Sequence, residues 1–439
     1  MKRRQFAAQV SAAALAASSA GAAVEEKPAL LGGAPVRKGA MGPSWPVFDQ
    51  TEEQAVAKVA RSGKWWRGGG DQVARFEAEY AKLTGAKFCQ AVSNGTSALI
   101  CSLGALGVGP GDEVIVPPYT FVATVNAVLL HGALPVFVDS HPDSFQLDHR
   151  KVEAAITDRT VAIVPVHMGG GVGDVDAFLE VGRKRSLPVV EDAAQAHLAQ
   201  WRGRHVGTWG AVGCFSFQAS KNLNAGEGGA VLTNDERLMD RLYAFQNNGR
   251  SRRATGTPDF TYGSPGGNFR LTEFQGALLL AQMNRIEAWA VRRESNASYL
   301  TELLRDVPGI VPARMPSGCT RNAYHLYMFR YQAEQFGGLP RAKFLQAMRA
   351  EGVACSGGYE PLNKDPLMEK ALSSRGYERL YGKGAFAKWA RRTECPENDR
   401  LCREAVWWGQ TVLLAERPVM EEIAAAVRKV RRNARALMA

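Results

Sequence analysis

The chain has 439 residues, of which 46% are hydrophobic and 22% charged, and its formal net charge is +11. This length allows a large buried core, usually divided between two domains. After the first two dozen residues no segment is long and apolar enough to span a membrane, no Cys/His cluster has metal-ligand spacing, and no nucleic-acid-binding motif accompanies the charge, so we expect no membrane anchor, metal or nucleic-acid partner.

The first 22 residues have the pattern of a signal peptide. Positive charge at Arg3 and Arg4 precedes a run of small apolar residues at 10–22, which ends in small residues that suit cleavage. The spacing of Arg3, Arg4 and Phe6 resembles a twin-arginine signal. We therefore expect export to the periplasm. The alternative is a cytoplasmic protein with an irregular N-terminal extension.

Strand-like and helical patterns alternate through the next two hundred residues. Strands are predicted at 113–116, 135–139, 161–166, 187–191, 213–217 and 229–233, and helices at 122–131, 174–185 and 235–246. This alternation predicts an α/β fold with a mainly parallel sheet that is covered by helices on both faces. Ligands bind such sheets beyond the carboxyl ends of the strands.

The pattern changes after about residue 275, where a smaller α+β domain is predicted. Its elements are a long connecting helix, a strand, a helix and a C-terminal helix, at 274–304, 324–331, 341–351 and 420–438. The predicted division of the chain is an N-terminal segment, a large domain and a small domain, at 23–50, 51–290 and 291–439. The basic residues at 428–435 are expected on the solvated side of the last helix.

A polar turn, Ser93-Asn94-Gly95-Thr96-Ser97, follows an apolar run and leads into a helical pattern. Backbone N–H groups at a helix start, together with Thr and Ser hydroxyls, can bind an anion. An ordinary capped turn between a strand and a helix would have the same sequence. Both interpretations stay open at this point.

An acidic residue and a lysine extend this pattern. Asp192 closes the apolar run at 187–190, and Lys221 precedes a glycine-rich turn at 225–230. Pyridoxal 5'-phosphate (PLP) needs an amine that forms a Schiff base and a carboxylate that keeps its pyridine nitrogen protonated. Asp after a strand is more often a helix cap, and most lysines are solvated, so the hypothesis depends on the set of residues.

The motifs follow a fixed order along the chain: Asn94-Gly95-Thr96-Ser97, Pro117-Pro118-Tyr119-Thr120-Phe121, Glu191-Asp192-Ala193-Ala194-Gln195, Ser216-Phe217-Gln218-Ala219-Ser220-Lys221 and Gly226-Glu227-Gly228-Gly229. In this order they resemble the DegT/StrS-type aminotransferases of sugar and cyclitol biosynthesis. That family consists of PLP-dependent transferases of fold type I. The resemblance extends over nearly the whole chain after the first 30 residues.

The resemblance assigns a role to each matching residue. Lys221 would form the Schiff base and Asp192 would pair with the pyridine nitrogen, so these two are the predicted catalytic residues. The other predicted cofactor contacts are Gln195 at the phenolic oxygen, Phe121 on the ring, and Thr96, Ser97 and Ser216 at the phosphate. Asn268 would reach the phosphate of a partner subunit, which implies a homodimer with shared active sites.

Several residues keep a second interpretation. Phe121 could belong to ordinary apolar packing, and Asn268 could cap its own helix. Gln195 would share a helix face with Asp192 if a helix begins at that acid. Cys395 and Cys402 flank a polar loop, and their spacing does not establish whether they pair.

The intact set favours an enzyme that moves an amino group from glutamate or glutamine to a keto-sugar or keto-cyclitol in two half-reactions. Local sequences look most similar to inosose aminotransferases and 3-amino-5-hydroxybenzoate synthases. The predicted substrate-side residues, each of which could instead be a packed polar residue, are Tyr119, His167, Tyr324, His325 and Tyr359. The alternative from another class is an exported PLP-fold binding or sensor protein without turnover.

Overall fold

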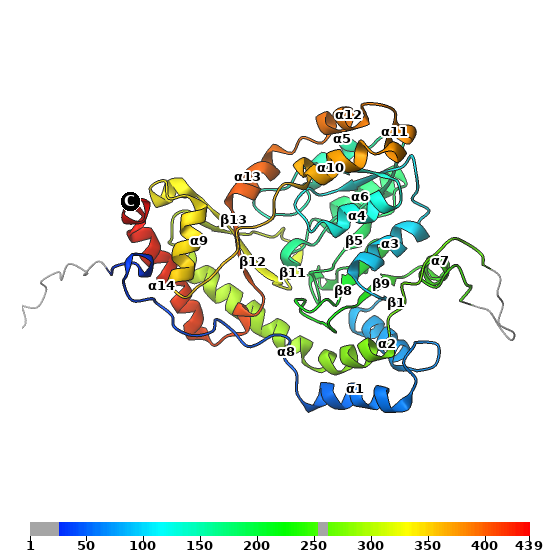
Figure 1. Cartoon of the computed structure of the whole chain (residues 1–439), viewed down its shortest axis with the longest axis horizontal. Coiled ribbons are helices and arrows are strands. Elements are labelled where there is room, and N and C mark those ends of the chain that lie inside the picture. The colour runs from blue at the N-terminus through cyan, green and yellow to red at the C-terminus, as the bar shows by residue number, and fades with distance from the viewer. Residues whose placement is uncertain (1–25, 253–261) are drawn as a thin grey trace, which may run out of the picture.

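The computed structural model describes residues 26–252 and 262–439 of the chain (Figure 1). Seven strands form the central sheet: β1 (Phe88–Val92), β2 (Glu113–Val116), β3 (Leu134–Phe137), β4 (Thr160–Ile163), β5 (Val190–Asp192), β8 (Val212–Ser216) and β9 (Gly229–Thr233). Their order is β1-β9-β8-β5 followed by β4-β2-β3, and isolated parallel bridges from Ile163 to Val189 and from Val166 to Asp192 join the two groups. Only β9 runs antiparallel to its neighbours, so the predicted mainly parallel sheet is confirmed.

Helices cover both faces of this sheet because strand side chains alternate in direction. Val114 and Val116 pack with α3 (Gly95–Ala105), α4 (Ala123–Leu130) and α7 (Glu236–Gln246). Ile115 points the opposite way and packs with α5 (His149–Ala155) and α6 (Val175–Arg185). On that second face, α2 (Gln72–Thr84) and α8 (Glu273–Leu304) cover β1, β8 and β9.

The predicted elements lie close to the observed ones. The helices predicted at 174–185 and 235–246 begin one residue later, because Asp174 and Asp235 are caps whose side chains accept N–H groups of the first turn. The strand predicted at 187–191 forms only as β5, three residues further on. Pro188 has no N–H to donate to a ladder, which delays the strand.

The smaller part of the fold is α+β, as predicted. β10 (Ile310–Pro312), β12 (Leu326–Tyr331) and β13 (Ala405–Gly409) form an antiparallel sheet that packs on α9 (Arg341–Ala350) and α14 (Arg417–Arg432). The C-terminal helix predicted at 420–438 is two helices, α14 and α15 (Ala434–Met438). The remaining elements are α1 (Gln50–Ser62), β6 (Gln200–Trp201), β7 (Arg204–His205), β11 (Cys319–Arg321) and the 3-10 helices η1 (Ala29–Leu31), η2 (Met168–Gly170), η3 (Ala333–Phe336), η4 (Leu362–Lys364) and η5 (Val412–Leu414).

Four short helices between β12 and β13 were not predicted: α10 (Pro366–Leu372), α11 (Arg375–Tyr381), α12 (Ala385–Arg392) and α13 (Pro396–Glu404). They lie beside the large sheet at the top of Figure 1, far along the chain from the strands they touch. Met368, Trp389 and Cys395 belong to the same core as Phe137 of β3. The C-terminal third of the chain therefore contributes to both cores, and the domain division at residue 290 stays a prediction.

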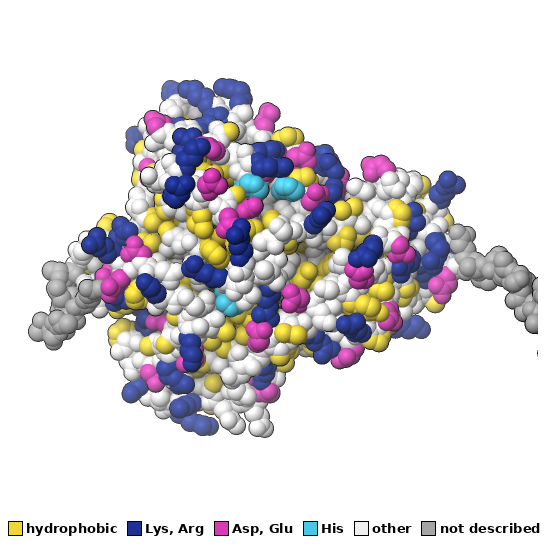
Figure 2. All heavy atoms as spheres, turned by 180° about the vertical axis from the view of Figure 1, so that it is seen from behind, with side chains coloured by type: hydrophobic (Ala, Val, Ile, Leu, Met, Phe, Trp, Pro, Cys, Tyr) yellow, Lys and Arg dark blue, Asp and Glu magenta, His cyan; other side chains and the backbone are white. Residues whose placement is uncertain are grey.

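Charged side chains are distributed over the surface with both signs. On the face shown in Figure 2, Lys and Arg mix with Asp and Glu and form no continuous basic surface. The expectation that the basic C-terminal residues are solvated is wrong for Lys429, which is buried and pairs with Glu351 at 3.0 Å. A buried cation needs such a partner to offset its lost hydration.

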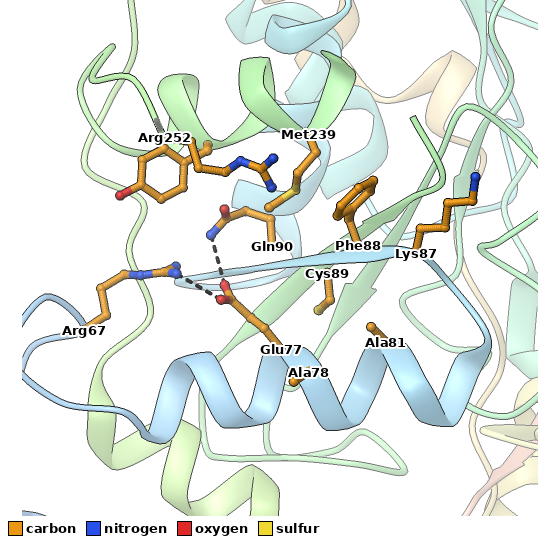
Figure 3. A pocket seen from close by; sticks show the side chains of 11 residues that line it. Arg67, Glu77, Ala78, Ala81, Lys87, Phe88, Cys89, Gln90, Met239 and Arg252 are labelled. Carbon is orange, nitrogen blue, oxygen red and sulfur yellow. Dashed lines mark hydrogen bonds and ion pairs between the residues drawn. The ribbon is translucent and has the colours of Figure 1, made fainter. Parts of the chain in front are cut away.

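The edge strand β1 is covered by side chains. Glu77 of α2 accepts the backbone N–H of Ala91 at 2.8 Å, and Arg67 pairs with Glu77 at 3.0 Å. Figure 3 shows Glu77 pointing between Arg67 and Gln90, at a cavity of about 350 Å³ beside the strand. These contacts satisfy backbone groups that an open edge would expose.

All seven cysteines, including Cys395 and Cys402, are free thiols. In the two described ranges, no helix combines the length and the apolarity needed to cross a bilayer.

Replacing Trp389 by Ala tests the packing of α12 on the large sheet. The Trp389 ring lies 5.8 Å from that of Phe137, its indole N–H donates to the Pro135 carbonyl at 2.6 Å, and the side chain is buried. We expect the free energy of unfolding to fall by about 3–5 kcal/mol. Urea denaturation followed by circular dichroism measures it, and a loss below about 1 kcal/mol would contradict this packing.

Candidate active site

A cavity of about 680 Å³ lies beyond the carboxyl ends of the central strands. Six of the eight predicted site residues line it: Thr96, Phe121, Asp192, Gln195, Ser216 and Lys221. Elements from the smaller part of the fold close its other side through His325, Tyr359 and Trp407. Residues that are distant in the sequence therefore meet at one place, where ligands bind in folds of this class.

Asp192 is the last residue of β5 and is 4% exposed. The Thr124 hydroxyl donates to its Oδ2 at 2.8 Å, and the Ala194 N–H donates to its Oδ1 at 3.2 Å. Burial raises the pKa of this carboxyl, and these hydrogen bonds only partly oppose the rise. A cation placed against the carboxylate would stabilise the charged form.

The residues after Asp192 form turns, so two interpretations from the sequence are wrong. Asp192 does not cap a helix, and Gln195 does not share a helix face with it. Gln195 instead accepts the N–H of Gly169 at 2.8 Å, and its amide nitrogen lies 3.4 Å from the Tyr359 hydroxyl. This places the Gln195 side chain at the wall of the cavity, between the two parts of the fold.

Lys221 lies on a closed loop after β8. The N–H groups of Ala219 and Ala225 donate to the carbonyls of Gly226 and Phe217, each at 2.9 Å, which closes the loop at both ends. Burial lowers the pKa of the lysine amine to about 8, although the negative charge of Asp192 acts in the opposite direction. A partly deprotonated amine near neutral pH is a competent nucleophile.

The turn after β1 is both a capped helix start and part of the cavity wall, so the two open interpretations are compatible. The Asn94 side chain accepts the N–H of Ser97 at 2.8 Å and caps α3. Gly95 and Thr96 are in the first turn, where backbone N–H groups lack intrahelical acceptors. A side chain at Gly95 would meet the β-carbon of Ser216 at 2.6 Å, so glycine lets β8 approach this turn. Together these groups can hold an anion.

Two predicted residues lie outside the cavity wall. The Ser97 hydroxyl is 2.8 Å from that of Ser93, and the residue is 5% exposed. Asn268 is exposed and bridges to Asn247, on the stretch that precedes α8. The structure therefore does not bring these two side chains to the cavity of their own chain.

Phe121 is 57% exposed and lines the cavity, so ordinary core packing is not its role. An aromatic ring at the mouth of a cavity is available to cover a flat ligand and exclude water from it.

The predicted substrate-side residues separate into two groups. His325 and Tyr359 line the cavity. His167 is fully buried, and its Nε2 lies 3.0 Å from Glu191, whose carboxylate also accepts three backbone N–H groups. Tyr119 and Tyr324 are not part of the wall, and Tyr119 packs against Phe145 in the core.

Thr124 and Trp407 are two of the cavity-lining residues that were not predicted from the sequence. Thr124 lies on α4, and its contact with Asp192 spans 68 positions of the chain. Trp407 comes from β13, which pairs with β12 in the smaller sheet. For Thr124, the sequence offered no more than a threonine in the predicted helix directly after Phe121. For Trp407, no local sequence pattern indicates a role in the site.

Comparisons with known proteins agree with this arrangement. A model of the DegT/DnrJ/EryC1/StrS aminotransferase family matches residues 46–382. The chain is 37% identical to L-glutamine:2-deoxy-scyllo-inosose aminotransferase of Streptomyces kanamyceticus, over 91% of this chain and 95% of that protein. It is 34% identical to 3-amino-5-hydroxybenzoate synthase of Amycolatopsis mediterranei, over 88% and 97%.

A solved structure shows the same likeness. The crystal structure of a 3-amino-5-hydroxybenzoic acid synthase superposes with a TM-score of 0.80 and 33% identity, covering 89% of this chain and 99% of that one. The fold-type I architecture predicted from the motifs is therefore confirmed.

The comparisons correct the predicted export. The relatives are named for the amination of a cyclitol with L-glutamine and for the synthesis of 3-amino-5-hydroxybenzoate. These names describe biosynthetic enzymes, and this finding contradicts the prediction of a periplasmic protein, which is wrong. Residues 1–22, on which the twin-arginine interpretation rested, lie outside the described residues.

The ordered motifs, the cavity that they line and the length of the matches all lead to one assignment. The family model spans the strands, turns and lysine loop that make the cavity, and the relatives match over nearly their whole length. The chain is an aminotransferase of the DegT/DnrJ/EryC1/StrS family.

Proposed function

We propose that this enzyme uses PLP to transfer the amino group of glutamine, or of glutamate, to the carbonyl carbon of a keto-cyclitol or related keto-sugar. The observation that carries the proposal is the single cavity shared by the Lys221 amine, the buried Asp192 carboxylate and the anion-binding turn at Gly95 and Thr96. These groups match an aldehyde, a basic ring nitrogen and a phosphate, which are the three functional parts of PLP.

The residues of the chain would hold the cofactor as follows. Asp192 would hold a proton on the ring nitrogen, and the cation there would reverse the rise in its pKa that burial causes. The turn at Gly95 and Thr96, with the Ser216 hydroxyl, would bind the phosphate, and Phe121 would cover the ring. PLP supplies an electron-withdrawing ring that makes bonds next to the transferred nitrogen easier to break.

Lys221 would carry out the proton movements. Its amine would hold the cofactor when no substrate is bound and would be free once a substrate amine has taken its place. In the first half-reaction the free Nζ would take a proton from the carbon of the donor that bears the amino group, and in the second it would deliver a proton to the former carbonyl carbon of the acceptor. Because burial lowers the pKa of this amine to about 8, it can both accept and release a proton near neutral pH.

The charge of the cavity supports an uncharged acceptor. Among the described residues that line it, Lys221 is the only lysine or arginine. A nucleotide-linked sugar would bring a diphosphate, whose charges need cationic or N–H donors. Relatives named for inosose and glutamine favour the same acceptor class and the same donor.

The first prediction tests this function. Glutamine added to the PLP-loaded enzyme should bleach its visible absorbance, and a keto-cyclitol such as scyllo-inosose should restore it. Initial rates with both substrates varied should give parallel double-reciprocal lines, because the donor product leaves before the acceptor binds. Colour that persists with every amino donor would indicate a binding protein without turnover, and intersecting lines would rule out two separate half-reactions.

A second prediction concerns pH. Only the unprotonated Lys221 amine attacks the aldehyde of PLP, and its fraction rises as pH increases through its pKa. The rate at which the cofactor-free protein captures PLP should therefore rise to a plateau around a midpoint near 8, the lowered pKa of Lys221. Stopped-flow absorbance between pH 6 and 11 measures it. A midpoint above about 10, where ordinary lysines titrate, would show that the amine is not desolvated.

We also propose a homodimer in which Asn268 reaches the partner's phosphate site. Asn268 is exposed and outside its own cavity. Nearby on the surface, Trp65 and Trp66 are 55% and 61% exposed, and their backbones pair with Glu273 and Thr272 just after Asn268. Exposed aromatic side chains of this size are typical of surfaces that bind another protein.

Mixing two inactive variants tests the shared site. Hybrids of Lys221→Ala and Asn268→Ala subunits should place both defects in one site and neither in the other. Activity should then return to a fraction of the wild-type level after subunit exchange, since one site in each hybrid is intact. No recovery, with exchange confirmed by native mass spectrometry, would mean that Asn268 acts only within its own chain.

A further inference from the structure

An N-terminal strap, residues 26–49, runs across the molecule from the smaller part of the fold to α1 (Figure 1). At its start, the buried carboxylate of Glu351 accepts the N–H groups of Ala29 and Val36, at 2.8 and 3.1 Å. At its end, Gln282 of α8 donates to the Val47 carbonyl at 2.8 Å. The strap is therefore held at both ends, and its middle is a fixed part of the structure.

Trp45 lies in this middle stretch and contacts the loop that carries Lys221. Its indole N–H donates to the carbonyl of Ala219 at 2.8 Å, two residues before the lysine. The half-buried indole packs edge-on against Trp289, with ring centroids 5.2 Å apart, and the Arg293 guanidinium lies 5.6 Å from its centroid. These contacts fix the direction of the indole N–H.

A second contact reaches the same loop from the smaller part of the fold. The amide nitrogen of Gln410 lies 3.5 Å from the carbonyl of Ser220, the residue before Lys221. The Gln410 oxygen accepts two hydrogen bonds from Arg293, at 2.8 and 2.5 Å. The Gln410 amide is thereby oriented with its N–H groups toward the loop.

Arg293 is fully buried, and within the described ranges it has no carboxylate partner and one nitrogen without any partner. Burial alone lowers the pKa of its guanidinium to about 9. A guanidinium without a carboxylate partner is costly to bury. Its contacts with the Gln410 oxygen and the Trp45 ring offset part of that cost and fix the positions of all three side chains. The strap also touches this region directly, since a side chain at Gly42 would meet the Thr411 carbonyl oxygen at 2.2 Å.

We propose that Trp45 is a positioning residue for Lys221, which acts by holding the Ala219 carbonyl, and that Gln410 assists it at Ser220. The two carbonyls directly before the lysine are thus tied to segments outside the central sheet. An amine that must attack and then transfer protons needs its position fixed to a fraction of an ångström. Trp45 and Gln410 do not line the cavity, so they act on Lys221 and not on the substrates.

The test compares Trp45→Phe with Trp289→Phe. The first variant keeps an aromatic ring in the strap but loses the N–H that reaches Ala219. The second makes the same chemical change in the ring that packs against it, which has no hydrogen bond to the loop. Hydrogen–deuterium exchange of peptides spanning 217–225 is measured on the cofactor-free and the PLP-loaded protein, together with kcat and KM for both substrates.

We expect Trp45→Phe to speed exchange in this loop by roughly three- to tenfold, the factor for one lost hydrogen bond, and to lower kcat by a similar factor with KM unchanged. Trp289→Phe should change neither. The kinetic part rests on the proposed function, whereas exchange in the cofactor-free protein does not. A failure of PLP capture by the wild type would therefore be recognised separately.

Equal exchange and equal kcat in the two variants and the wild type would overturn the proposal, as would a rise in KM without a change in loop exchange. If melting temperatures show that Trp45→Phe does not fold, Gln410→Glu replaces it. That variant keeps an acceptor for Arg293 but loses the donor to Ser220, so it should speed loop exchange while the protein stays folded. Unchanged exchange in it would also overturn the proposal.

Discussion

The burial of the Asp192 carboxylate at the end of β5 is the constraint on which the site depends. The carboxylate is 4% exposed, and among the described residues its hydrogen-bond donors are only the Thr124 hydroxyl and the Ala194 N–H, so its charge is incompletely compensated. The cationic ring nitrogen of PLP would complete that compensation. The aldehyde of the same cofactor would then lie within reach of the Lys221 amine. The sheet order brings this about, because β5 and β8 are parallel neighbours whose ends carry Asp192 and the segment leading to Lys221.

The smaller part of the fold does more than close the cavity. Tyr359 and Trp407 form one wall, while Gln410 contacts the loop before Lys221. The N-terminal strap is anchored through Glu351 and ends beside the same loop at Trp45. A movement of the smaller part of the fold would therefore displace the cavity wall at Tyr359 and Trp407 and also the contacts to the loop before Lys221. The position of the lysine is thereby coupled to the opening and closing of the cavity.

Much of the site could be predicted from the sequence, because short apolar strands ending in polar motifs place those motifs at one edge of a parallel sheet. Asp192, Lys221 and Gly95 were found in this way. The contacts of His167 and Ser97 could not be predicted from the sequence. In the structure, the His167 ring is hydrogen-bonded to Glu191 and the Ser97 hydroxyl to that of Ser93, so neither side chain lines the cavity. The four helices α10–α13 were missed because each is short and is stabilised by packing against residues far away along the chain, which no local pattern reveals.

The central claim, that the Lys221 amine binds PLP beside Asp192, can be tested by chemical trapping. Borohydride reduction of the PLP-loaded enzyme, followed by digestion and mass spectrometry, locates the lysine that carries the pyridoxyl group. We expect a single modified peptide that contains Lys221, and no modification of that peptide when reduction precedes the addition of PLP. Modification of a different lysine, with Lys221 unlabelled, would contradict it.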